Sequence, residues 1–434
     1  MNVRIYISVI LLFLTVGLGS YGANLTANVA SIDITPPIEM KYTLGGYGER
    51  QNKPAISVHD PIMAKALALK KGDHKYMIIT LDLLGLPANV KPDLLKRIAA
   101  SGWTAENMML LPSHSHGSLE MAALNSKNQL NNPNLGIFQP ELLTFFIDKL
   151  ETLVKNADKN YQEVKIGTGS RILEGLNRNR RDDPDVDKEL TVTRVDLKNG
   201  KPLAVLVNWT AHPTFLGGKD MMTSAEWPGY TQIELQKMIG QGVTAMYYNG
   251  AEGDQSAVLN NAGNGYEKIQ VYGKLIAEKA FGLYQEIKTK KVDNFSSTYQ
   301  VIQLPEHAAH PAFMKTGGEE YGLTEQTVKF VMNMLAPTSV GIGAVRIGDL
   351  VIAGVPGEMT AILGKKVKTN LKKDGAKYVA IGGLANEWIS YILDRDQYLH
   401  GEGYESSVSF FGPELGNVIS DAVINTAAPL AKEK

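Results

Sequence analysis

The apolar positions of this chain follow two periods, one typical of strands and one typical of helices. Short continuous apolar runs predict buried strands, whereas apolar residues three and four positions apart predict helices. The clearest helix is the segment 140–157, which opens on Pro140 and places Leu142, Phe146 and Leu150 on one face. Strands are expected at 76–86, 108–113, 191–209, 243–250, 344–357 and 378–388, and helices at 90–100, 140–157, from Pro228 onward, 267–290, 360–373 and 413–428.

Two of the expected strand segments carry a turn signal near their centre. Asn199-Gly200 and Gly348-Asp349 each stand between apolar runs, which is typical of hairpins. Hairpins pair strands antiparallel, and alternation of strands with helices favours parallel pairing, so we expect mixed sheets. The prediction is an α/β fold, with mixed sheets and hairpins flanked by helices, in a single large domain. The polar stretch 288–297 is the best candidate for an internal linker.

The composition narrows the function classes. The 434 residues are 44% hydrophobic, with a formal net charge of −1 and no long basic run. Nucleic acid is therefore not an expected partner, since its binding rests on clustered Lys and Arg. The chain has no cysteine, which excludes disulfides, a thiol enzyme and a cysteine-ligated zinc module. Any metal ion must be held by His, Asp, Glu or Tyr.

The N-terminus is typical of an export signal. Arg4 precedes a nearly all-apolar run, and the small residues Ser20 and Gly22 stand at positions −3 and −1 before Ala23. This pattern predicts a cleaved signal peptide at 1–22 and a periplasmic or secreted domain at 23–434. The alternative is an uncleaved membrane anchor, although the run is short for a membrane span.

Metal-capable side chains stand directly after several apolar runs. His114 and His116 follow one such run, and His212 and Glu358 each follow another. Loops at strand ends hold side chains rigidly and leave them accessible, so we expect these residues to converge. A catalytic zinc ion takes about three protein ligands and keeps one position for water, which predicts a zinc hydrolase. The alternative is surface or helix-capping roles for the histidines and a helix N-terminal role for Glu358.

The order of motifs resembles the neutral/alkaline non-lysosomal ceramidases, which are zinc amidases that cleave the N-acyl bond of ceramide. The resemblance runs over nearly the whole chain after its N-terminus. It rests on the segments SIDITPP, GGYGER, LDLLG, HSHG, LNRNR, NWTAHPT, TSAEWPGY, NGAEGDQS, VPGE, NEWISYILDRDQY, GYESS and FGP. It implies the catalytic domain of that family without the C-terminal β-sandwich domain of its long members.

The resemblance also implies roles for individual residues. It assigns zinc to His114, His212, Glu358 and Tyr391, and it places His116 beside the metal-bound water. Further positions carried over are Arg178 and Tyr404 at the scissile amide, with Gly46, Ser224 and Trp388 as substrate-binding residues. From the residues alone, Tyr391 could be an aromatic packing residue and Arg178 a solvated loop residue. Asp254 could be a turn or cap residue, or it could support a ligand histidine. Asp82 is a further candidate to orient a histidine.

The expected reaction is hydrolysis of an N-acyl amide, with ceramide as the first candidate substrate. His116 would act as general base, and Tyr404 and Arg178 would stabilise the oxyanion. One alternative is another acyl amide or ester, such as an acylated amino sugar, a peptide or a cell-wall fragment. A second alternative is a non-catalytic protein that binds a lipid or glycan. A lipid substrate implies transient contact with a membrane surface, and no obligate protein partner is expected.

Overall fold

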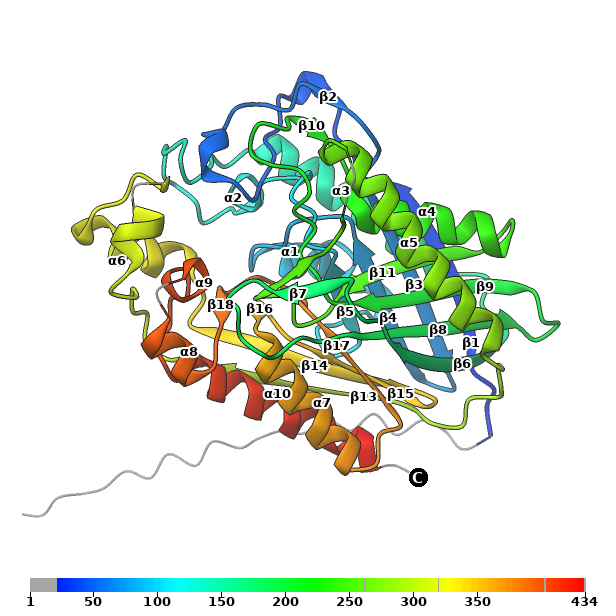
Figure 1. Ribbon diagram of the computed structural model, residues 1–434. Coiled ribbons are helices and arrows are strands. Elements are labelled where there is room, and N and C mark those ends of the chain that lie inside the picture. Colours follow the sequence, from blue (N-terminus) through cyan, green and yellow to red (C-terminus); the bar gives the residue numbers. More distant parts are fainter. Residues whose placement is uncertain (1–21, 261–262, 319, 402, 433–434) are drawn as a thin grey trace, which may run out of the picture.

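The computed structural model describes residues 22–260, 263–318, 320–401 and 403–432, and its centre is a pair of facing β-sheets (Figure 1). The larger sheet has eight strands in the order β11-β9-β8-β6-β1-β3-β4-β5. Their bounds are β1 Thr26–Asp33, β3 Met63–Lys71, β4 His74–Leu81, β5 Met108–Pro112, β6 Gln162–Ile172, β8 Glu189–Leu197, β9 Pro202–Trp209 and β11 Thr244–Asn249.

The smaller sheet has four strands in the order β13-β14-β15-β17. They span Phe295–Gln303 (β13), Ser339–Ile347 (β14), Leu350–Gly354 (β15) and Tyr378–Gly382 (β17). Three short strand pairs complete the pairing: β2 Ser57–Val58 with β10 Met222–Thr223, β7 Asn177–Asn179 with β12 Gln255–Ala257, and β16 Glu358–Met359 with β18 Tyr391–Ile392.

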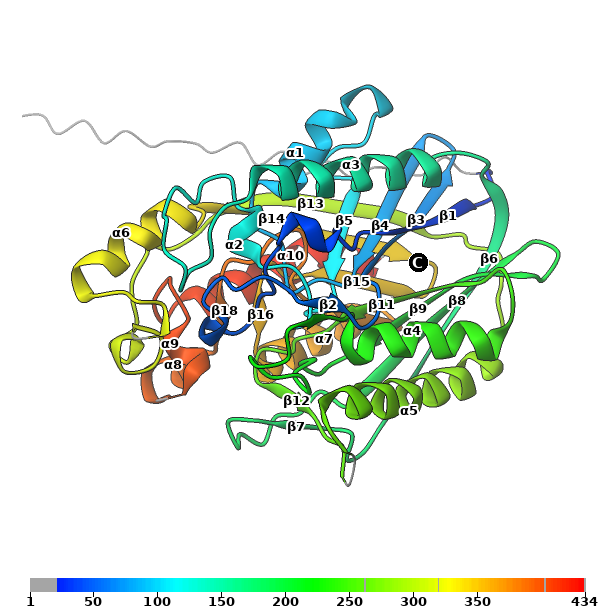
Figure 2. The same ribbon diagram turned by 90° about the horizontal axis from the view of Figure 1, so that it is seen from above.

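The core between the sheets is apolar because alternate residues of each strand face inward. Leu67 and Ile78 of the larger sheet share a buried cluster with Val345 and Ile352 of the smaller sheet. Helices pack against the outer faces of both sheets, and Figure 2 looks down on those that cover the larger sheet. The result is a four-layer arrangement of helices, sheet, sheet and helices.

The helices form three groups that cover the sheets. α1 (Val90–Arg97) and α3 (Pro140–Ala157) pack on one half of the larger sheet, and α4 (Glu226–Ile239) and α5 (Gly265–Glu286) pack on the other. α7 (Ala361–Lys373) and α10 (Leu415–Lys432) cover the smaller sheet. The remaining helices are α2 Met121–Leu124, α6 Glu325–Leu335, α8 Arg395–His400, α9 Tyr404–Ser407, the 3-10 turns Ile38–Met40, Gly48–Arg50 and Ala99–Ser101, and a π-turn at Met314–Gly318.

The larger sheet curls so that its two edge strands approach each other. At the end of β11, Asn249 donates a hydrogen bond of 3.1 Å to the carbonyl of Ser113, which directly follows β5. Sheets twist in one direction, and eight strongly twisted strands bring the first and last close together. The loops after β5, β9 and β11 consequently meet at one end of the molecule.

The mixed α/β fold with two hairpins is confirmed. β8 and β9 turn at Asn199-Gly200, and β14 and β15 turn at Gly348-Asp349. The expected linker at 288–297 joins no separate units: Lys290 pairs with Ile166 beside the larger sheet, and β13 begins at Phe295. The helix expected to reach residue 290 ends at Glu286.

The signal-peptide prediction falls on residues 1–21, which lie outside the described part of the chain, and on Gly22. Among the described residues, no helix is long and apolar enough to cross a bilayer.

Candidate metal centre

His114 lies in a strained loop that fixes its imidazole. The residue stands two positions after β5 and adopts a left-handed backbone with φ of 69°, which is uncommon for a residue other than glycine. Its Nδ1–H donates to the carbonyl of Leu84 at 2.7 Å. Because Nδ1 carries the proton of this hydrogen bond, Nε2 is unprotonated and its lone pair is free to bind a metal ion.

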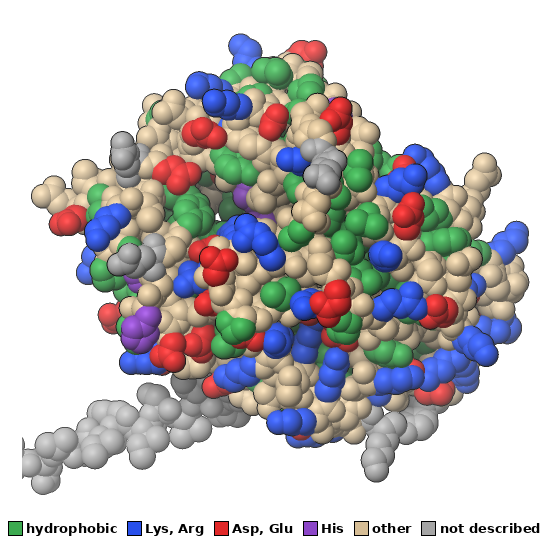
Figure 3. Space-filling view, viewed as in Figure 1, with side chains coloured by type: hydrophobic (Ala, Val, Ile, Leu, Met, Phe, Trp, Pro, Cys, Tyr) green, Lys and Arg blue, Asp and Glu red, His purple; other side chains and the backbone are tan. Residues whose placement is uncertain are grey.

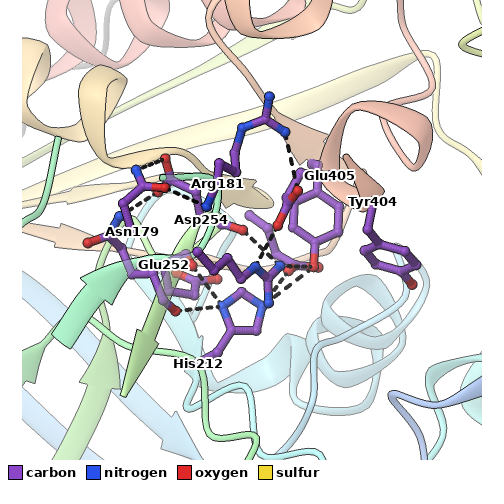
Figure 4. Close-up of polar contacts among 12 residues, drawn as sticks. Asn179, Arg181, His212, Glu252, Asp254, Tyr404 and Glu405 are labelled. Atoms are coloured by element: carbon purple, nitrogen blue, oxygen red, sulfur yellow. Dashed lines mark hydrogen bonds and ion pairs between the residues drawn. The ribbon is translucent and has the colours of Figure 1, made fainter. Parts of the chain in front are cut away.

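His212 is fixed in the same way from the other edge of the sheet. It follows β9, is fully buried, and donates from Nδ1 to the carbonyl of Glu252 at 2.7 Å. Figure 4 shows this contact beside the labelled Asp254 and Tyr404. The Nε2 lone pair of His212 therefore points toward the same centre as that of His114.

Glu358 and Tyr391 lie on the short strands β16 and β18, on the side of the smaller sheet. The two residues are direct partners in the parallel pairing of these strands. The Glu358 Oε2 atom lies 3.2 Å from His114 Nε2 and 3.1 Å from His212 Nε2, and the Tyr391 hydroxyl lies 3.4 Å from His212 Nε2. A tetrahedron with bonds of about 2.0 Å has edges of roughly 3.3 Å, so these four side chains fit one bound ion.

His212 and Glu358 are held in the states that bind a cation. Burial lowers the pKa of His212 to about 4, assisted by the charge of Arg180. Burial opposes ionisation of Glu358, but His114 and His212 outweigh it and hold the pKa of that carboxyl well below its usual range. Neutral imidazoles and an ionised carboxylate are the forms that ligate metals.

His116 lies against this group but is held differently. Its Nε2 is 3.2 Å from His114 Nε2, whereas its buried Nδ1 has no hydrogen-bond partner among the described residues. The pKa of His116 lies well below its ordinary value, mainly because the ring is buried and also because His114 and His212 are close to it. The three histidines form one metal-capable group, and His116 is the member whose ring is not fixed by a carbonyl.

The predicted arginine is not at the centre, and a neighbouring one is. Arg178 is exposed on β7, where its guanidinium donates at 3.4 Å to the carbonyl of Asn179. Arg180 instead donates to the Tyr391 hydroxyl at 3.0 Å and pairs with Glu405 at 2.6 Å. β7 ends at Asn179 and the chain turns there, which aims the side chain of Arg180 inward.

A cavity of about 1000 Å³ opens from the metal centre to the surface. Its wall includes the side chains of His114, His116, Glu358 and Tyr391. The wall also includes a set of apolar side chains: Leu86, Met121, Phe313, Val331, Met332, Leu335 and Phe410. Figure 3 shows the hollow in this face of the molecule, with a histidine visible inside it.

Three of the predicted substrate-contacting residues line this cavity. Trp388 donates from Nε1 to Glu358 Oε1 at 2.7 Å, and Tyr404 exchanges a hydrogen bond of 2.9 Å with the hydroxyl of Tyr321. Gly46 backs onto His116, where an added Cβ would come within 2.3 Å of Nδ1. Ser224 does not reach the cavity: it is fully buried and donates to Asp60 Oδ1 at 2.7 Å.

The two aspartates considered from sequence contact no histidine ring. Asp254 accepts from the backbone N–H of Ala361 at the start of α7, which supports its reading as a cap. Asp82 accepts from the backbone of Met63 and from Gln232.

Sequence reasoning missed several residues at the site. Arg50 donates to the carbonyls of Gly45 and His116 and thereby fixes the loop that carries His116. Glu252 is a fully buried carboxylate within reach of His114 and Glu358. The sequence signal for Glu252 is its position directly after a buried strand, in the segment NGAEGD. Arg50 stands after no such strand, so its position in the sequence does not indicate its role.

Comparison with known proteins assigns the family. The model of the neutral/alkaline non-lysosomal ceramidase N-terminal domain matches residues 26–268 and 323–419. The neutral ceramidase of Drosophila pseudoobscura is 22% identical, over 93% of this chain and 74% of its own length. The neutral ceramidase of Pseudomonas aeruginosa is 21% identical, over 85% of this chain and 66% of its own length.

The fold agrees with the sequence comparison. The crystal structure of the Pseudomonas aeruginosa neutral ceramidase superposes with a TM-score of 0.80 and 19% identity, over 94% of this chain and 75% of that chain. Fold and site together define a hydrolase of amide bonds. The chain belongs to the neutral/alkaline non-lysosomal ceramidase family.

Proposed function

We propose that this protein is a zinc-dependent amidohydrolase that cleaves ceramide to sphingosine and a fatty acid. The observation that carries the proposal is the convergence of four side chains beside the cavity: Glu358 Oε2 lies 3.2 Å from His114 Nε2 and 3.1 Å from His212 Nε2, and the Tyr391 hydroxyl lies 3.4 Å from His212 Nε2. The relatives named as neutral ceramidases support the substrate. The apolar side chains in the wall of the cavity suit an acyl chain.

The metal supplies the activation: a zinc ion lowers the pKa of a bound water from about 15.7 toward 7 and polarises the scissile carbonyl. The protein residues supply proton transfer. His116 is neutral and its Nε2 faces the centre, so it accepts a proton from the attacking water and later passes it to the leaving amine.

Oxyanion stabilisation is assigned to Tyr404 rather than to Arg178. Tyr404 lines the cavity, and a phenol keeps its proton at neutral pH, so the hydroxyl is available as a hydrogen-bond donor. Arg180 touches Tyr391 and Glu405, and its role is to position the Tyr391 hydroxyl. Trp388 positions Glu358 through its indole bond.

Access to the substrate is proposed to involve transient contact with a membrane surface, because ceramide resides in lipid. The export predicted from the N-terminal sequence would place the enzyme in the periplasm or outside the cell.

The test is fatty-acid release from ceramide by purified protein, measured with and without a zinc chelator and after zinc is restored. Release that the chelator abolishes and zinc restores supports both the substrate and the metal. A zinc-loaded protein that releases no fatty acid would exclude ceramide, and other acyl amides and esters would then be screened. The zinc-loaded His116→Ala variant is the control for background hydrolysis.

A further inference from the structure

The hydroxyl of Tyr404, to which the proposed function assigns the oxyanion, is bonded to a second phenol. The Tyr321 hydroxyl lies 2.9 Å from it and is the one hydrogen-bond partner of the Tyr404 side chain in the described part of the chain. The ring of Tyr404 meets the ring of Tyr391 edge to face, with 5.9 Å between their centroids. Tyr321 and Tyr404 both line the cavity. The phenol pair therefore lies beside the proposed metal centre.

Contacts on three sides hold Tyr321 in place. Its backbone N–H donates to the carbonyl of Gly317 at 2.9 Å, and its own carbonyl accepts from Asn132 Nδ2 at 3.2 Å. Its ring stacks parallel to that of Phe313, with 6.4 Å between the centroids. Tyr404, in contrast, is the first residue of the four-residue helix α9, and 38% of it is exposed. The fixed phenol can thus orient the more accessible one.

The protons of the two hydroxyls decide what Tyr404 can do. A phenol titrates near pH 10, so Tyr321 and Tyr404 each carry a proton at about neutral pH. One of these protons lies between the two oxygens, and the other is free. If Tyr321 donates, the Tyr404 O–H is free for a substrate oxygen, and a hydroxyl that accepts a hydrogen bond is also a stronger donor. If Tyr404 donated instead, its proton would point away from the substrate.

We infer that Tyr321 is a positioning residue for amide cleavage, which donates to Tyr404 and thereby directs the Tyr404 O–H toward the oxyanion. The inference rests on the proposed function, since that function assigns the oxyanion to Tyr404. Negative charge that develops on the substrate oxygen is then stabilised by two hydroxyls in series. The bond from Tyr321 gains strength only in the transition state, so its loss should lower kcat and leave KM unchanged.

The first test is a double-mutant cycle on ceramide with Tyr321→Phe, Tyr404→Phe and the double variant. Phenylalanine keeps the stacked ring and removes only the hydroxyl. We expect Tyr404→Phe to lower kcat about 10²-fold or more. Tyr321→Phe should lower kcat about tenfold and keep KM within about twofold of the wild type.

The double variant separates positioning from simple packing. Because Tyr321 acts through Tyr404, adding Tyr321→Phe to Tyr404→Phe should lower kcat by no more than about twofold further. Losses that multiply in the double variant would show that Tyr321 acts independently of Tyr404 and would overturn the inference. A Tyr321→Phe protein with the kcat of the wild type would overturn it as well.

Tyr161→Phe is the matched control. It also removes a tyrosine hydroxyl, which donates to Asp158 at 2.7 Å, and it does not line the cavity. Its kcat should stay within about twofold of the wild type, and Tyr321→Phe should keep its full metal content. Equal losses of kcat in Tyr161→Phe and Tyr321→Phe, or a loss of metal from Tyr321→Phe, would overturn the inference.

A second measurement needs no turnover. An alkyl phosphonate is a stable tetrahedral anion that resembles the intermediate of amide hydrolysis, and its affinity for the zinc-loaded protein is measured by calorimetry. The affinity should fall about tenfold in Tyr321→Phe and no further when Tyr321→Phe is added to Tyr404→Phe. Equal affinities in Tyr321→Phe and the wild type would overturn the inference. A wild type that shows this dependence on Tyr321 but releases no fatty acid from ceramide would overturn the proposed substrate and support the inference, so the two failures are distinguishable.

Discussion

Trp388 and Glu358 are joined by a hydrogen bond of 2.7 Å from the indole Nε1 to Oε1. The other oxygen of that carboxylate, Oε2, lies 3.1 Å from His212 Nε2. The indole thus fixes the rotation of the carboxylate and leaves one oxygen for the metal centre. Since Trp388 also lines the cavity, one side chain connects the cavity wall with the proposed metal ligands.

Replacing this indole tests its effect on the metal. Trp388→Phe removes the bond to Glu358, so metal affinity should fall roughly 10–100-fold, as it does when hydrogen bonds to metal ligands are lost. Chelator competition measures the change. Trp103→Phe is the control, because Trp103 donates a similar bond of 2.9 Å to Asp158 at a remote site. Equal losses in the two variants would contradict the proposed role.

The two histidines of the HSH segment should separate metal binding from proton transfer. His114→Ala should lose most of its bound metal, since His114 is one of the four ligands proposed here. His116→Ala should keep its metal and lose about 10²–10⁴-fold in turnover, the usual contribution of a general base. Metal content by mass spectrometry and turnover on ceramide are measured together. A His114→Ala protein that retains metal and activity would show that the centre is assigned wrongly.

The two arginines on either side of Asn179 make a matched pair. Arg180→Met leaves Tyr391 without its donor and removes one partner of the buried Glu405, so turnover and the free energy of unfolding should both fall, the latter by about 3 kcal/mol. Arg178→Met should change neither, because that side chain is exposed. Steady-state kinetics and denaturant unfolding decide between them. Loss of activity in Arg178→Met alone would restore the assignment made from sequence.

Gly46 is required by the position of His116. In Gly46→Ala the new Cβ would come within 2.3 Å of His116 Nδ1, so turnover should drop at least about tenfold while metal content stays unchanged. Gly46 has φ of 89°, so part of any effect is backbone strain. Gly175→Ala controls for that strain, because Gly175 has φ of 74° and open space around its Cβ position. Equal turnover in both variants would contradict the predicted contact with His116.

A buried lysine should make stability depend on pH. Lys91 is buried, which lowers its pKa from 10.5 to about 7. Between pH 7 and 10 the unfolded chain holds a proton that the folded Lys91 has lost, so stability rises with pH in that window. Relative to Lys91→Met, the wild type should gain on the order of 1 kcal/mol per pH unit. Thermal unfolding of both proteins from pH 7 to 9 measures the difference, and a constant gap would contradict the prediction.

The hairpins, the helices with clear apolar faces and the positions of the metal-capable residues after strands could be predicted from the sequence. The reason is physical: β5, β9 and β11 are continuous apolar runs, and the polar residues after them have to lie in loops at strand ends. His114 and His212 lie close together because the larger sheet curls. Glu358 and Tyr391 join them because the β16–β18 pair lies against that end of the sheet. No local pattern in the sequence reports either arrangement.

Long-range contacts explain what sequence reasoning missed. β3 reads MAKALALKK, and its alanines, leucines and lysines suit a helix as well as a strand. It is a strand because it pairs with β1 on one side and β4 on the other, and Lys65 is tolerated there because its ammonium group bonds Gln232 and the carbonyl of Ala245. Arg178 lies on β7 and Arg180 directly follows it, and this difference decides which of the two side chains reaches the site. The mixed charges of the segment do not reveal where the strand ends.

The ligand set draws on parts of the chain that are far apart, with 146 residues separating His212 from Glu358. In a protein without cysteine, an ion held by His114, His212, Glu358 and Tyr391 would act as a cross-link between both sheets. Cross-links that close long loops restrict the unfolded chain most. Metal loading would then protect the folded enzyme from proteolysis, in the way that disulfides protect secreted proteins.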